Sequence, residues 1–61
     1  MKKGMKISWL TLCEGKVTKV IGQISSEVKG NYFTAIGSCE GTGRLWGEVL
    51  NQSNRNLTIL A

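Results

Sequence analysis

The sequence predicts an all-β domain built around a three-stranded antiparallel meander. Two short turns indicate it: Glu14-Gly15 and Gly30-Asn31 each separate two stretches in which apolar residues alternate, which is typical of two-residue hairpins. The registers that the two turns impose agree, because both place the same residues of the middle strand on one face. The 61-residue chain has no proline, so no position in these stretches is barred from a hydrogen-bonded ladder.

The first hairpin joins strands expected at residues 5–13 and 16–28. Its turn places Trp9 opposite Val20, so that both side chains point to the same inner face. Apolar residues in 16–28 also recur at helical spacing, which keeps a helix as the competing interpretation. Gly22 in the interior and several β-branched residues favour the strand.

The second hairpin joins the middle strand to one expected at residues 32–39. Its turn pairs Val28 with Phe33 and, further along, Gly22 with Cys39. The two hairpins together predict one apolar inner face, lined by Met5, Ile7, Trp9, Val20, Gly22, Ile24, Val28, Phe33, Ala35, Gly37 and Cys39.

Two further strands complete the predicted domain. After a glycine-containing loop, residues 44–50 read either as a strand or as a short helix, and Gly47 favours the strand. The polar residues 51–56 predict a hairpin loop that leads into a closing strand at 56–61. Five short strands with a turn about every ten residues describe a small antiparallel barrel or sheet of SH3-like or OB-like kind.

The length of the chain allows one small core. Residues 1–4 are expected to be a flexible basic tail, and residues 5–61 a single small β domain. Such a domain has a thin margin of stability, which makes a homo-oligomer the expected state. The apolar run 7–12 is short and interrupted by polar residues, so neither a signal peptide nor a membrane span is predicted, and a cytoplasmic location is expected.

Positive charge is concentrated at the start of the chain, whose net formal charge is +4. Small antiparallel barrels bind single strands by combining basic groups with exposed aromatic rings. The leading hypothesis is therefore a nucleic-acid-binding protein, with single-stranded nucleic acid or RNA as the favoured partner, acting through a basic outer face of the sheet. The residues expected to bind are Lys6, Lys16, Lys19, Lys29, Tyr32, Arg44 and Trp46.

The contribution of Trp46 depends on which way its strand faces. If Arg44 and Trp46 point outward, they form a cation–aromatic pair that suits stacking on a base. In the alternative, Trp46 belongs to the core.

A second apolar patch beside the first turn favours a different function. Leucines and β-branched residues of the first two strands fall on the outer face, and nothing in the meander covers them. The patch consists of Leu10, Leu12, Val17 and Ile21. It predicts a protein interface, either in an inhibitor or adaptor of phage or mobile-element type or at a homodimer seam. A cationic membrane-active peptide is a third alternative.

The composition argues against catalysis and against a cofactor or metal site. The chain has no histidine and no aspartate, so the usual acid–base and nucleophilic groups are missing. Its two cysteines, Cys13 and Cys39, form no close pair in the sequence, whereas a structural zinc needs four ligands. Cys39 is expected to be a buried free thiol rather than a partner of Cys13 in a disulfide.

Overall fold

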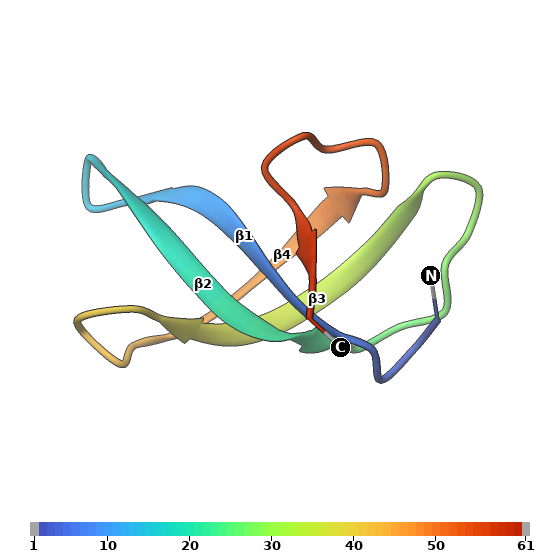
Figure 1. Cartoon of the computed structure of the whole chain (residues 1–61), viewed down its shortest axis with the longest axis horizontal. Helices are drawn as coiled ribbons and strands as arrows, with labels where there is room; N and C mark the ends of the chain where they lie inside the picture. Colours follow the sequence, from blue (N-terminus) through green and yellow to red (C-terminus); the bar gives the residue numbers. More distant parts are fainter. Residues whose placement is uncertain (1, 61) are drawn as a thin grey trace.

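The computed structural model describes residues 2–60, which form one antiparallel sheet of five strands. The strands are β1 (Lys6–Cys13), β2 (Lys16–Ile24), β3 (Tyr32–Cys39), β4 (Leu45–Asn51) and β5 (Thr58–Ile59). Their order in the sheet is β4-β3-β2-β1-β5 (Figure 1). The predicted all-β class is confirmed, with an open sheet instead of a closed barrel. The first residue of the predicted tail and the last residue of the predicted closing strand lie outside the described residues.

The first hairpin has the predicted register. Trp9 pairs with Val20 and Ile7 with Gly22, as the Glu14-Gly15 turn requires. Both turn residues have positive φ, 53° for Glu14 and 79° for Gly15, which is the geometry of a type I′ turn. The helical alternative for residues 16–28 is wrong, because β2 is a strand throughout Lys16–Ile24.

The register of the second hairpin differs from the prediction by two residues. The turn itself forms, since Lys29 and Tyr32 exchange backbone N–H···O bonds of 2.9 and 3.0 Å. Further along, however, Ile24 pairs with Ala35 instead of Gly37, and β2 ends at Ile24 instead of residue 28.

Serine side chains account for this shift. The backbone N–H of Thr34 donates to the Ser26 hydroxyl at 2.9 Å, so a side chain takes the place of a backbone acceptor. The segment after Ile24 therefore bulges by two extra residues before the ladder resumes at Lys29. Because side chains alternate with a period of two, a shift of two leaves every residue on its predicted face.

A pair of glycines lets the backbones of β2 and β3 approach closely in the centre of the sheet. Gly22 and Gly37 lie opposite each other on β2 and β3. A β-carbon on Gly22 would lie 2.1 Å from the carbonyl oxygen of Ile36 and 2.4 Å from the Gly37 Cα. Only two residues without side chains allow the backbones to approach so closely, and glycines in strands often mark such bends.

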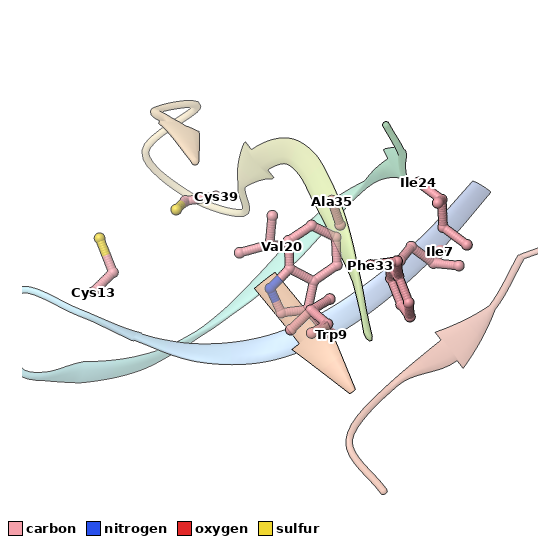
Figure 2. Close-up of a cluster of buried hydrophobic side chains, with 9 residues drawn as sticks. Ile7, Trp9, Cys13, Val20, Ile24, Phe33, Ala35 and Cys39 are labelled. Carbon is pink, nitrogen blue, oxygen red and sulfur yellow. The ribbon is translucent and has the colours of Figure 1, made fainter. Parts of the chain in front are cut away.

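The core occupies the inner face of the sheet (Figure 2). Its buried apolar residues are Ile7, Trp9, Cys13, Val20, Ile24, Phe33, Ala35, Cys39 and Leu50, with Met5, Val28, Trp46 and Leu57 packed against them. The inner face predicted from the two hairpins is thus confirmed. Burial of these side chains supplies most of the stabilisation of such a small sheet.

The closing strand does not form the predicted hairpin with β4. Two asparagines turn the chain, because the Asn51 side-chain oxygen accepts from the Ser53 N–H and that of Asn54 from the Asn56 N–H, both at 2.8 Å. The chain then crosses to the opposite edge of the sheet, where β5 pairs with β1 at Ile7 and Ser8.

Candidate functional site

The outer face of the sheet is the side opposite the core, and it is largely apolar. Strand alternation places seven aliphatic side chains there: Leu10, Leu12, Val17, Ile21, Ile36, Leu45 and Val49. Their exposed fractions run from 43% at Leu10 to 78% at Leu45. The predicted four-residue patch is therefore exposed, and three further residues from β3 and β4 extend it. Isolated exposed aliphatic residues are ordinary, but a group spread over four neighbouring strands is typical of an interaction surface.

The same face carries positive charge. Lys6 lies opposite Gln23 and Lys19 opposite Leu10, both at outer-face positions as predicted. Lys29 pairs with Tyr32 just beyond the end of the sheet. No acidic residue occupies an outer-face position of β1 to β4 in the described chain. Lysines are therefore the only charged side chains at outer-face positions of these four strands in the described chain.

The paired glycines form the floor of a hollow in this surface. Its walls are the side chains of Ile21 and Ile36, and Lys6 and Ser38 also line it. Because the walls are aliphatic and the floor is backbone, the hollow combines apolar contact with exposed peptide groups. Such a combination suits an apolar side chain of a partner.

A second hollow lies beside β5 and is more polar. It is lined by Lys19 and Arg55, with Leu10, Asn56 and Thr58. Arg55 was not among the residues expected to bind, because its place in a loop gave no hint that it would lie near Lys19. The fold brings two cations together there through the return of the chain to β1.

Three of the expected nucleic-acid-binding residues are not on the outer face. Lys16 pairs with Cys13 and so occupies an inner-face position at the end of β2. Trp46 pairs with Gly37 and packs against the core, which corrects the outward placement. Arg44 precedes β4, and its Nη1 donates to Glu14 Oε1 at 2.5 Å. Tyr32 is then the only aromatic side chain at an outer-face position of the described strands.

The inner face holds a polar contact that the sequence did not reveal. Glu48 Oε1 accepts hydrogen bonds from the indole nitrogens of Trp9, at 2.5 Å, and Trp46, at 3.2 Å. The carboxylate satisfies the indole N–H of the buried Trp9, which would otherwise lose its hydrogen bond to water. The alternation in β4 could not show that two tryptophans share the Glu48 carboxylate.

The two cysteines lie at one end of the inner face. Both are buried, Cys13 at 7% exposure and Cys39 at 1%. Burial raises the pKa of the Cys39 thiol, and the neighbouring Cys13 thiol raises this pKa further. The burial of Cys39 confirms its predicted place on the inner face.

Among residues 2–60, no group of three or more histidine, cysteine or acidic side chains is placed to hold a metal ion. Nor does that part of the chain contain a helix with the length and apolar character needed to cross a membrane. Compared with protein-family models, curated proteins and solved structures, the chain matches none of them.

Proposed function

We propose that this chain is a non-enzymatic protein-binding module that docks through the outer face of its sheet. The observation that carries the proposal is the extent of the exposed aliphatic surface, which reaches from Leu12 on β1 to Val49 on β4. Burial of such a surface against a partner is favourable at about 25 cal/mol per Å² of apolar area. An inhibitor or adaptor of phage or mobile-element type is the class of protein that this arrangement suits.

The charge of the outer face defines the partner. Lys6 and Lys19 border the aliphatic surface, and no acid balances them on it. A complementary protein surface is therefore apolar at its centre and acidic at its rim, because like charges opposite these lysines would oppose binding. The apolar centre supplies affinity, and the acidic rim supplies orientation and association rate.

Site-specific photo-crosslinking in the producing cell tests the proposal. A photoreactive amino acid at Val17 or Val49 is expected to form a discrete adduct with one acidic-rimmed protein, whereas the same group at Glu40 or Ser53, in exposed turns, is not. The paired variant Leu12→Ser and Ile21→Ser should reduce the adduct at least about tenfold, since each lost aliphatic side chain removes roughly 1–2 kcal/mol of burial.

Two outcomes contradict the proposal. One is an adduct with a second copy of the chain alone, which would assign the outer face to a homo-oligomer. The other is equal labelling from the outer face and from the turns, which would show that the aliphatic surface has no preferred partner.

Nucleic acid remains the second candidate, favoured by two pairs of side chains. Lys29 lies beside Tyr32, which combines a cation with an exposed ring, and Lys19 and Arg55 line one hollow. The absence of Trp46 from the outer face weakens this candidate, because a single ring is a small stacking platform.

A salt titration separates the two candidates. Labelled single-stranded and duplex oligonucleotides are titrated with the protein at several salt concentrations, and sedimentation of the same sample gives the oligomeric state. A nucleic-acid binder loses affinity steeply with salt, and each lost phosphate contact in Lys19→Gln or Arg55→Gln flattens the slope by about 0.9 on duplex DNA. Binding that survives these changes but fails in Leu12→Ser belongs to the aliphatic surface.

A further inference from the structure

Cys13 and Cys39 come from strands that are not neighbours, yet the two thiols are neighbouring groups at one end of the inner face (Figure 2). Cys13 ends β1 and Cys39 ends β3, and β2 lies between these strands in the sheet. Figure 2 shows both side chains at the same end of the inner face, with the Cys39 sulfur directed toward Cys13. Their partners on β2, Lys16 and Val20, are also four residues apart, so a flat sheet would separate the two cysteines by roughly 16 Å. The curvature of the sheet therefore brings them together.

Contacts on either side hold the two cysteines at this junction. The backbone N–H of Cys39 donates to the Arg44 carbonyl at 2.8 Å. The Arg44 guanidinium in turn pairs with the carboxylate of Glu14, the residue that follows Cys13. The β1–β2 turn and the β3–β4 loop, which lie at the same end of the molecule in Figure 1, are thereby tied together over the thiols.

We propose that Cys13 and Cys39 form a reversible intramolecular disulfide by exchange with a low-molecular-weight disulfide such as oxidised glutathione. The thiolate of Cys13, the more exposed of the two, attacks one sulfur of the glutathione disulfide and releases one glutathione. Cys39 then loses its proton and attacks the Cys13 sulfur of the mixed disulfide, releasing the second glutathione. One disulfide bond breaks for each one formed, and the two cysteine protons end on the two glutathione molecules.

The bond would join β1 directly to β3 across β2. A cross-link that closes the segment between Cys13 and Cys39 into a loop lowers the conformational entropy of the unfolded chain. Small domains commonly depend on such cross-links. The raised pKa of Cys39 supports a slow second step at neutral pH, because the thiolate is the attacking species. The rate of closure therefore increases with pH.

Incubation of the reduced protein in glutathione redox buffers of graded potential tests the proposal. Intact-mass measurement after alkylation should show a monomer that has lost two hydrogens, and peptide mapping without reductant should join the peptides of Cys13 and Cys39. The melting temperature of the oxidised protein should be higher than that of the reduced protein by more than about 10 °C. Cys13→Ser and Cys39→Ala serve as separate controls, so that a folding defect in one does not remove the comparison.

In both control variants the upward shift should be absent under the same buffers. The proposal is overturned if the oxidised wild-type protein carries only glutathione adducts or only bonds between chains. If the intramolecular bond forms and the melting temperature does not increase, the bond strains the native fold, and its stabilising role is overturned.

Discussion

Gly22 and Gly37 face each other across β2 and β3, and neither position has room for a β-carbon. A methyl group at Gly37 would lie 2.4 Å from the carbonyl oxygen of Ile21, and one at Gly22 would meet backbone atoms at similar distances. Backbone cannot rotate aside as a flexible side chain can. The pair therefore fixes the separation of the two central strands.

Gly22→Ala is expected to destabilise the fold by at least about 2 kcal/mol, because the strands must move apart to admit the methyl group. Gly47→Ala is the matched control: a β-carbon there lies 3.5 Å from Ile36 Cγ1, an ordinary contact. Urea unfolding of both variants measures the difference. Equal stabilities would show that the close approach of β2 and β3 is not required.

Glu48→Ala is expected to lower the free energy of unfolding by about 2 kcal/mol. The substitution removes the acceptor of two indole N–H groups, one of them on the buried Trp9. Glu48→Gln retains an oxygen at the same place and should lose less than about 1 kcal/mol. Urea unfolding followed by tryptophan fluorescence reports both stability and the surroundings of the indoles. A glutamine variant as unstable as the alanine variant would assign the effect to charge alone.

Glu14→Asn should stabilise the first hairpin, because asparagine tolerates the positive φ of 53° better than glutamate. The substitution also removes the exposed ion pair with Arg44. The comparison is therefore made in an Arg44→Gln background, where a gain of roughly 0.5–1 kcal/mol is expected in thermal or urea unfolding. No gain in that background would contradict the turn argument.

The stability of the reduced protein should fall at alkaline pH. Burial raises the folded-state pKa of Cys39 above its ordinary value of 9.0, so the unfolded chain releases this proton at lower pH than the folded chain. The stabilisation from the buried neutral thiol is fully present below pH 9.0 and is lost as pH rises through the folded-state pKa. The free energy of unfolding, measured with urea from pH 7 to 11, should decline more steeply for wild type than for Cys39→Ala. Parallel curves would contradict the prediction.

The outer face should tolerate polar substitution. Val49→Ser leaves no cavity, because the valine side chain is already largely in solvent. It should change the free energy of unfolding by less than about 1 kcal/mol. Leu50→Ser, one residue along β4 but in the core, should cost roughly 2–5 kcal/mol. The pair distinguishes a surface kept for binding from one that contributes to folding, and equal losses would place Val49 in the packed structure.

Much of the fold could be predicted because turn chemistry and alternation agreed. Glu14-Gly15 set the register of β1 against β2, and the inner face followed from it. The second register was wrong because the Ser26 hydroxyl competes with backbone acceptors, an effect without a periodic signature. The predicted faces were nevertheless correct, because the register shift of two residues equals the side-chain period of a strand.

The sequence did not predict the path of the last strand or part of the site, because both depend on contacts between distant segments. Pairing of β5 with β1 depends on contacts between distant segments, such as Leu57 against the core, which no local pattern encodes. The orientation of Trp46 was open for the same reason, because the alternation in β4 is clear but does not say which side meets the core. The aliphatic outer face, in contrast, was visible from Leu10 and Val17 once the first register was known.

The tight approach at the glycine pair also has a consequence for recognition. Because neither glycine adds a side chain, the outer face keeps a hollow at this point, between Ile21 and Ile36. A flat surface laid against the sheet would leave that hollow empty. A surface that covers the outer face completely must therefore carry a protrusion that fits between the two isoleucines.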